Sequence, residues 1–187
     1  MLYYKKLSLP QEISVFWERG SWILQGPLGI LSLSFKKTSI FYEGFRIKFL
    51  IHPKNYQKFL FLMHDLNDRK TQALGGTLIS LLDQKILGIS HGFFLNLDIR
   101  GIGYRVNIEE TGLIFKLGYS HEIFFQNSPN MRFFSPKSNI LSIYSINFQE
   151  LTQICERIRR LKKIEPYKGK GIRFVDEKVL IKIGKKK

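Results

Sequence analysis

Apolar residues recur at helical spacing in two well-separated segments of the chain. In the first segment the aliphatic residues of one face are Leu74, Leu78, Leu81, Leu82 and Ile86. Asp68 or Thr71 is the expected start of this helix, and Gly88 is its expected end. In the second segment the residues of the apolar face are Leu151, Ile154, Cys155, Ile158 and Leu161. Asn147 and Glu150 have the spacing of a capping box, which predicts that the second helix begins just after Asn147.

Strands are predicted mainly between these two helices. Residues 95–100 alternate between apolar and polar side chains, which predicts a half-buried strand. Its apolar face carries Leu95, Leu97 and Ile99. Further short strands are predicted over residues 103–108, 113–117, 122–125, 131–134 and 140–145. Residues 39–69 do not follow this pattern, and we interpret them as a divergent hairpin plus an insertion.

A weak internal repeat relates the two halves of the chain. The residues that recur 92 positions later are Glu18, Gly20 and Gly26, which match Glu110, Gly112 and Gly118. In both copies the first glycine is expected at a hairpin turn and the second where the chain bends away. Runs of strands that end in one helix, twice over, predict an α+β protein with two similar domains. Each domain is expected to be a small, mostly antiparallel sheet packed against one helix.

The net charge of +15 is concentrated near the C-terminus. Residues 157–187 contain thirteen Lys or Arg and three Asp or Glu, which gives this segment a net charge of +10. A polyanion would stabilise such a local positive field, whereas a solvated basic tail is the simpler interpretation. We expect an N-terminal α+β domain over residues 1–92, an RNA-binding C-terminal α+β domain over residues 93–164, and a basic C-terminal extension over residues 165–187.

No catalytic or metal-binding pattern is evident in the sequence. Residues 101–103 lack the third glycine of a dinucleotide-binding motif, and residues 169–171 lack the spacing and the Ser or Thr of a phosphate-binding loop. The four histidines have no metal-ligand spacing. Cys155 is the single cysteine, so an internal disulfide and a cysteine-based zinc site are excluded, and a buried core residue is predicted rather than a reactive thiol. We expect no enzyme activity, no metal and no cofactor, although a site assembled from distant residues stays open.

Three segments combine glycine with basic and aromatic residues, at 100–105, 118–121 and 165–174. In the first, glycines permit close backbone approach to irregular RNA while Tyr104 and Arg105 supply a stacking face and donors. The alternative for this segment is a β-bulge with outward-pointing cations. In the third, Pro166 and Tyr167 give the basic tail a rigid start and an aromatic anchor, and the alternative is a flexible arm.

Four motifs carry a resemblance to a known family. They are Gly-Pro-Leu-Gly-Ile-Leu at 26–31, Gly-Ile-Gly-Tyr-Arg at 101–105, Leu-Gly-Tyr-Ser-His at 117–121 and, most specific, the segment at 165–174. With these motifs in this order, the chain resembles the bacterial-type large-subunit ribosomal protein L-six family along nearly its whole length. The resemblance implies no catalysis and binding to large-subunit ribosomal RNA, chiefly through the second domain and the tail. It also implies neighbouring large-subunit ribosomal proteins as partners and a position near the docking region of translational GTPases.

The motifs and the resemblance together predict the RNA-binding residues. These are Gly101, Gly103, Tyr104, Arg105, Ser120, His121, Lys162, Lys163, Tyr167, Lys168, Gly169, Lys170, Gly171 and Arg173. The expected donors to phosphate and sugar oxygens are Arg105, His121, Lys168, Lys170 and Arg173. The two tyrosines are expected to pack on sugars or bases, and the four glycines to let the backbone come close to the RNA.

The amino-acid composition and the first residues of the chain indicate a cellular location. The sequence is rich in Phe, Ile, Lys, Asn and Tyr, like proteins of AT-rich organellar genomes, and residues 1–10 have no signal or transit-peptide character. We expect a protein made inside an organelle, with the mitochondrion as first choice and the plastid as second. Charged residues interrupt the apolar stretches, so no membrane span is expected.

Two other functions are considered for this sequence. An assembly or regulatory RNA-binding factor is the alternative function. A peripheral membrane protein is disfavoured because the tail lacks a strong Trp or Leu face. Residues 35–69 are longer and more aromatic than is usual for the family, which leaves the contacts of the first half open.

Overall fold

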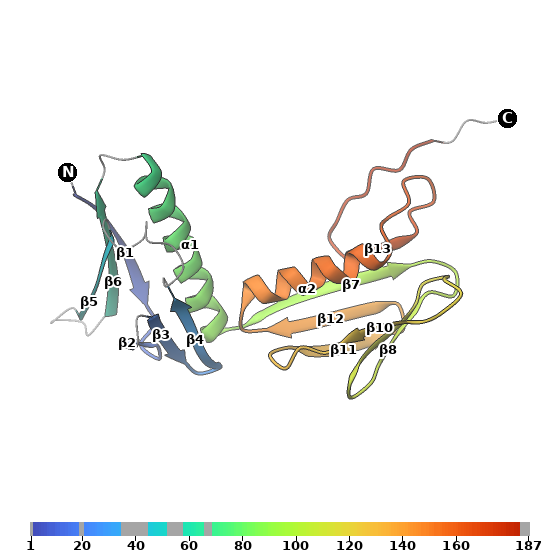
Figure 1. The fold of residues 1–187 in the computed structure, drawn as a ribbon, viewed down its shortest axis with the longest axis horizontal. Helices are drawn as coiled ribbons and strands as arrows, with labels where there is room; N and C mark the ends of the chain where they lie inside the picture. The colour runs from blue at the N-terminus through green and yellow to red at the C-terminus, as the bar shows by residue number, and fades with distance from the viewer. Residues whose placement is uncertain (1, 19–20, 35–44, 52–57, 66–68, 184–187) are drawn as a thin grey trace. The chain divides into compact units, whose positions relative to one another are not determined.

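The computed structural model describes residues 2–18, 21–34, 45–51, 58–65 and 69–183. The chain divides into two compact units, residues 1–92 and residues 93–187. Each unit has a hydrophobic core of its own and combines antiparallel sheets with one helix (Figure 1). The predicted α+β class with two similar domains is therefore confirmed.

The first unit contains two three-stranded antiparallel sheets. One has the order β1-β6-β5 and consists of β1 (Leu2–Leu9), β5 (Phe45–Ile51) and β6 (Lys58–Asp65). The other has the order β2-β3-β4 and consists of β2 (Ser14–Glu18), β3 (Ser21–Gly26) and β4 (Gly29–Ser34). Helix α1 (Arg69–Ser90) packs against strands of both sheets, so one helix closes the core of this unit.

Helix α1 extends beyond its predicted end. Gly88 lies inside the helix and is buried, so the prediction that the helix stops there was wrong. The buried face continues through Ile89, which is fully buried, and this packing outweighs the low helix propensity of one glycine. The chain leaves the helix at Gly92, which has φ +74° and donates its N–H to the Gly88 carbonyl over 2.9 Å. At the other end the helix begins at Arg69, so Thr71 is not its first residue.

The remaining predictions for the first unit have mixed outcomes. Leu78, Leu82 and Ile86 are buried on the predicted apolar face of α1. The hairpin predicted within residues 39–69 is confirmed, because β5 and β6 pair in antiparallel fashion. Asp68 and Gly20 lie outside the described residues, as do residues 35–44 and 52–57.

The second unit contains a four-stranded and a three-stranded antiparallel sheet. The first has the order β11-β12-β7-β13 and consists of β11 (Arg132–Lys137), β12 (Ile140–Ser145), β7 (Phe93–Arg100) and β13 (Gly171–Phe174). The second has the order β10-β9-β8 and consists of β10 (Ile123–Gln126), β9 (Gly112–Lys116) and β8 (Arg105–Ile108). The five short strands predicted for this half are all present, and β7 has the predicted alternation of burial.

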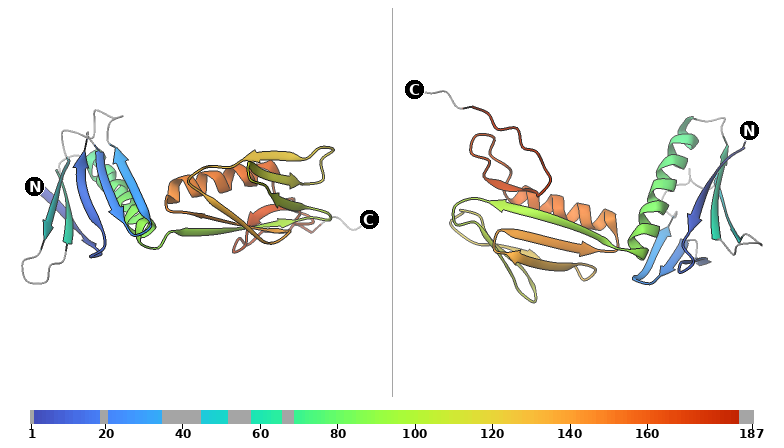
Figure 2. Two further views of the ribbon diagram at one scale, coloured as in Figure 1. Left: turned by 90° about the horizontal axis from the view of Figure 1, so that it is seen from below. Right: turned by 180° about the vertical axis from the view of Figure 1, so that it is seen from behind.

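Helix α2 (Phe148–Leu161) packs on β7, β12 and β13 (Figure 2). The predicted cap is confirmed, because the Asn147 side chain accepts a hydrogen bond from the Gln149 N–H over 3.3 Å and donates one to the Glu150 carboxylate over 2.9 Å. Cys155 is a fully buried free cysteine, as predicted. Burial raises the pKa of its thiol to about 12, and the charge of Glu156 adds to the shift. Neither helix in the described ranges has both the length and the apolar character of a membrane span.

The strand order of the first unit recurs in the second. Order β1-β6-β5 corresponds to β7-β12-β11, and β2-β3-β4 corresponds to β8-β9-β10. The two copies of the sequence repeat form β3 and β9, which are the central strands of the corresponding three-stranded sheets. Strand β13 has no counterpart among the described strands of the first unit. It joins the free edge of β7, so part of residues 165–187 belongs to the sheet of the second unit.

Candidate nucleic-acid interface

The C-terminal end of helix α2 carries several positive charges. Arg159 and Arg160 lie in the last turn, and Lys162 is the C-cap residue. Cations at this end of a helix complement the partial negative charge of its unpaired carbonyl groups. Lys163 follows directly and is exposed. The local sequence therefore gives α2 a positively charged C-terminal end.

The loop at residues 118–121 reaches this helix end through Tyr119. Its hydroxyl donates a hydrogen bond to the Leu161 carbonyl over 3.1 Å, which satisfies one of the terminal carbonyls of α2. The Lys162 ammonium lies 4.1 Å from the centroid of the Tyr119 ring, a cation–π contact. The loop turns at Gly118, which has φ +73°. Tyr119 belongs to the motif at 117–121 but was not among the predicted RNA-binding residues, and its structural role depends on a partner 42 residues away.

Ser120 and His121 lie at the exposed tip of the same loop. The Ser120 hydroxyl is 3.4 Å from Nδ1 of His121. Both side chains are available to a partner beside the end of α2.

The segment after α2 forms a closed turn. The Glu165 N–H donates to the Lys170 carbonyl over 2.8 Å, and the Gly169 N–H donates back to the Glu165 carbonyl over 2.9 Å. Gly169 has φ +66°, a conformation that favours glycine. Tyr167 and Lys168 lie exposed at the tip, and Tyr167 keeps 56% of its surface accessible. This part of the tail is an ordered turn held by backbone hydrogen bonds.

After this turn the chain enters β13 and the core. The Ile172 N–H donates to the Lys162 carbonyl over 3.0 Å, and the Ile172 side chain is 1% exposed. Gly171 is buried with φ +140°, and an added Cβ would lie 2.7 Å from the Lys163 carbonyl oxygen. The chain therefore requires glycine at position 171 for its own packing. Lys170 is half-buried at the start of this approach.

Arg173 is engaged within the protein. Its guanidinium lies 3.3 Å from the Asp98 carboxylate on β7, and the two side chains are only 15% and 13% exposed. Arg100 reaches the same carboxylate over 2.7 Å from the more exposed side. The Asp98 carboxylate offsets one of the two guanidinium charges, and Arg173 is mostly buried, so it has less to offer a phosphate than an exposed, unpaired cation has.

Arg159 also binds within the second unit. It donates to both carboxylate oxygens of Glu177, over 2.7 and 2.9 Å, and pairs with Glu156 on its own helix. Its guanidinium lies 4.8 Å from the centroid of the Phe174 ring. These contacts tie the residues after β13 to α2. Sequence reasoning did not single out Arg159, because its spacing from Glu177 follows no local pattern.

The segment at residues 101–105 connects to the same region through Tyr104. An added Cβ on Gly101 would lie 2.4 Å from the Tyr104 ring, and one on Gly118 would lie 2.9 Å from it. The ring also packs against the core of the second unit, which gives Tyr104 an intramolecular role. Gly103 is exposed with φ +72° and open space where a side chain would stand, and Arg105 is exposed on β8.

A chain of contacts thus links the three segments singled out from the sequence. Tyr104 packs beside Gly118, the adjacent Tyr119 binds the end of α2, and Lys162 binds β13. The exposed members of the predicted set along this chain are Gly103, Arg105, Ser120, His121, Lys163, Tyr167 and Lys168. The half-buried or buried members are Gly101, Tyr104, Lys162, Gly169, Lys170, Gly171 and Arg173. We call the exposed set the basic face of the second unit.

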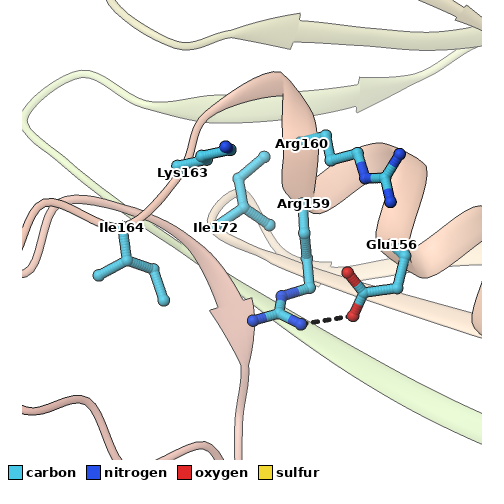
Figure 3. A pocket seen from close by; sticks show the side chains of 6 residues that line it. All are labelled: Glu156, Arg159, Arg160, Lys163, Ile164 and Ile172. Atoms are coloured by element: carbon cyan, nitrogen blue, oxygen red, sulfur yellow. Dashed lines mark hydrogen bonds and ion pairs between the residues drawn. The ribbon is translucent and has the colours of Figure 1, made fainter.

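A pocket of about 280 Å³ opens beside the basic face, next to the end of α2 (Figure 3). It is lined by Glu156, Arg159, Arg160, Lys163, Ile164 and Ile172. Among these side chains Arg159 contacts Glu156, as the dashed line in Figure 3 marks. Three of the six lining residues are cationic and one is acidic, so the pocket favours an anion.

Comparison with known proteins identifies the family. The family described as Ribosomal protein L6 matches residues 100–175. The chain is 34% identical to large ribosomal subunit protein uL6 of Ligilactobacillus salivarius, over 97% of this chain and 96% of that protein. It is 30% identical to large ribosomal subunit protein uL6m of Reclinomonas americana, over 98% and 97%. It is 31% identical to uL6 of Sphingopyxis alaskensis, over 98% and 97%.

These matches span both units of the chain, and the family match covers the basic face from β8 to β13. The proteins of this family are structural components of the ribosome and not enzymes. The chain belongs to the ribosomal protein L6 family, uL6, of the large ribosomal subunit.

Proposed function

We propose that the protein is a permanent structural constituent of a large ribosomal subunit and binds large-subunit ribosomal RNA through its second unit. The observation that carries this proposal is the linked arrangement at the end of α2, where Tyr119 holds one loop and Lys162 holds β13. Three sequence segments thereby present cations and aromatic rings side by side on an ordered backbone. Irregular RNA is bound by such a combination of phosphate contacts, stacking and close backbone approach.

The residues of the basic face have distinct proposed roles. Arg105, His121, Lys163 and Lys168 donate to phosphate and sugar oxygens, because their side chains are exposed. Tyr167 packs on a sugar or a base, since more than half of its surface is accessible. Ser120 and Gly103 allow polar contact and close approach of the backbone.

The less exposed residues act in other ways. Lys162 and Lys170 contribute positive potential from half-buried positions. Tyr104, Gly101, Gly169 and Gly171 hold the shape of the face, and Arg173 fixes β13 through Asp98. These residues support RNA binding by positioning the exposed donors.

The position in the particle is a further part of the proposal. We propose that the protein lies near the docking region of translational GTPases, with other large-subunit ribosomal proteins as neighbours; the resemblance to the family supports this. The first unit has a separate core and exposed apolar side chains such as Phe16 and Ile30, which fits a role in protein contacts.

A mitochondrial ribosome is the proposed location. The amino-acid composition supports it, as does the similarity to uL6m of Reclinomonas americana over nearly the whole chain. Bacterial relatives match equally well, and a plastid ribosome is the second possibility.

Sedimentation of ribosomes tests the proposed function. A permanent constituent stays with purified large subunits at one copy per particle after a high-salt wash. An assembly or regulatory factor with the same RNA-binding surface is released by the wash and found on precursor particles. Loss of the protein from washed, mature subunits would therefore contradict the proposal.

A further inference from the structure

We infer that the pocket at the end of α2 holds one phosphodiester group of the bound RNA, with Arg160 and Lys163 as its ligands. This inference rests on the proposed function and extends it to Arg160, which the sequence motifs did not indicate. The pocket of about 280 Å³ is slightly smaller than typical sites for drug-sized ligands, which measure about 300–1,000 Å³. It has room for a phosphate with part of its sugar.

The cationic side chains that line the pocket differ in whether the protein provides them with an acidic partner. Arg159 is paired with Glu156 and with both oxygens of Glu177. Within the described ranges, no hydrogen bond or ion pair engages the side chain of Arg160 or Lys163. Two cations at one opening therefore lack an anionic partner from the protein. A phosphate oxygen supplies that partner with charge-assisted hydrogen bonds, which are stronger than neutral ones.

One polar group of a pocket-lining residue is unpaired. The Nε–H of Arg159 is buried and has no acceptor among the described residues. Buried donors in folded proteins are normally paired, so an unpaired one calls for a specific explanation. Arg159 lines the pocket, so an anion bound there adds favourable negative potential around its guanidinium without a direct hydrogen bond to the buried Nε–H.

The nature of the wall favours a phosphodiester over a base. The uncharged lining residues are Ile164 and Ile172, and no aromatic ring lines the pocket. Bases are held chiefly by stacking on aromatic rings, which this pocket lacks, and the guanidinium of Arg159 is already held by Glu156 and Glu177. A sugar–phosphate unit instead needs cations and a small apolar contact, and both are present. Lys163 also belongs to the basic face, so one RNA strand can follow the face and place a phosphate in the pocket.

Three variants of the full-length chain separate the pocket from general electrostatics. Arg160→Gln removes a pocket cation, and Arg157→Gln removes an exposed cation of the same helix that does not line the pocket. Glu156→Gln removes the pocket carboxylate. The probe is a transcript of bacterial large-subunit ribosomal RNA. We expect Arg160→Gln to weaken binding about tenfold and to reduce the log–log salt slope by about 0.7–0.9. Arg157→Gln is expected to change affinity less than about twofold, and Glu156→Gln to tighten binding a few-fold.

A second readout is independent of affinity. The methyl groups of Ile164 and Ile172 are expected to shift in NMR spectra when RNA is added, because both line the pocket. The unfolding midpoint of each variant is measured first, and only variants with the midpoint of the wild type are compared. Equal weakening by Arg160→Gln and Arg157→Gln, or unmoved isoleucine signals with RNA bound, would overturn the pocket inference and leave the proposed function standing. Absence of wild-type binding to the transcript would overturn the proposed function itself, and the inference with it.

Discussion

Arg173 and Asp98 form an ion pair between β13 and β7, with 3.3 Å between the guanidinium and the carboxylate. The residues are 75 positions apart, and both side chains are largely buried. The pair fixes the last strand of the second unit to its neighbour. Arg173, which was predicted to contact RNA, therefore stabilises the fold through this ion pair. In the proposed function the donors are therefore exposed cations such as Lys163 and Lys168, which precede β13.

Removal of either partner of this pair is expected to destabilise the protein. Arg173→Ala leaves Asp98 with Arg100 as a partner, so we expect a loss of about 1–2 kcal/mol in the free energy of unfolding. Asp98→Ala leaves the largely buried Arg173 without its carboxylate, so we expect a larger loss of about 3 kcal/mol. Urea denaturation measures both, and Lys168→Ala serves as the exposed control with a change below about 0.5 kcal/mol. Equal, small effects of all three variants would show that the pair does not hold β13.

Gly171 and Gly103 provide a matched test of glycine in the second unit. Gly171→Ala places a Cβ 2.7 Å from the Lys163 carbonyl oxygen at φ +140°, so we expect a loss of about 2–4 kcal/mol. Gly103→Ala meets no atom within 4 Å, and only the positive φ of +72° costs about 1 kcal/mol. Thermal unfolding followed by circular dichroism compares the two. A larger loss for Gly103→Ala would contradict the packing described for β13.

Much of the second unit follows from local sequence signals. Helix α2 has a clear apolar face and an Asn147 cap, and both follow from residues within a single stretch of the chain, 147–161. Among the strands that precede it, β7 alternates in burial as the sequence predicts. The end of α1 was mispredicted because tertiary packing of Ile89 carries the helix past Gly88. Propensity is a weak signal beside such burial.

The site was predictable in composition but not in connectivity. Glycine, lysine and tyrosine indicated three segments that the fold links by contacts, yet they say nothing of which residues pair within the fold. The contact of Arg159 with Glu177 and that of Tyr119 with Leu161 depend on the tertiary structure. Strand β13 has only four residues and lies in a segment rich in Lys and Arg, so the alternation of Ile172 and Phe174 is too short a signal to predict its place in the sheet.

Tyr119 offers a test of loop positioning. Tyr119→Phe removes the hydrogen bond to the Leu161 carbonyl and keeps the ring that Lys162 contacts. We expect the free energy of unfolding to fall by at most about 1 kcal/mol. RNA affinity should fall about threefold, because the loop that carries His121 is less well ordered. Filter binding and urea denaturation measure the two effects.

Tyr167→Phe is the control for this experiment. Tyr167 is exposed, and no hydrogen bond of its hydroxyl is present among the described residues. We expect its stability to match that of the wild type. An unchanged RNA affinity for Tyr119→Phe would show that the tyrosine hydroxyl does not position the loop.

The buried thiol of Cys155 predicts a specific dependence of stability on pH. Its pKa is about 12 in the folded protein and 9.0 in its ordinary state. Above pH 9 the unfolded chain loses this proton while the folded chain keeps it, so the free energy of unfolding falls as pH rises. The contribution approaches about 1.4 kcal/mol per pH unit. Cys155→Ala should flatten this part of the curve between pH 9 and 11. Identical slopes for the two proteins would contradict the burial of an un-ionised thiol.

We propose that the basic face of the second unit binds ribosomal RNA by contacts to phosphates. The most direct measurement is the salt dependence of binding to a large-subunit RNA transcript for the wild type and two double variants. Lys163→Gln with Lys168→Gln removes two cations of the face, and Arg132→Gln with Lys137→Gln removes two from β11, at the opposite edge of the sheet from β13. We predict a steep linear log–log dependence, reduced by about 1.4–1.8 in the first variant and unchanged in the second. A flat salt response, or equal reductions in both variants, would contradict the account.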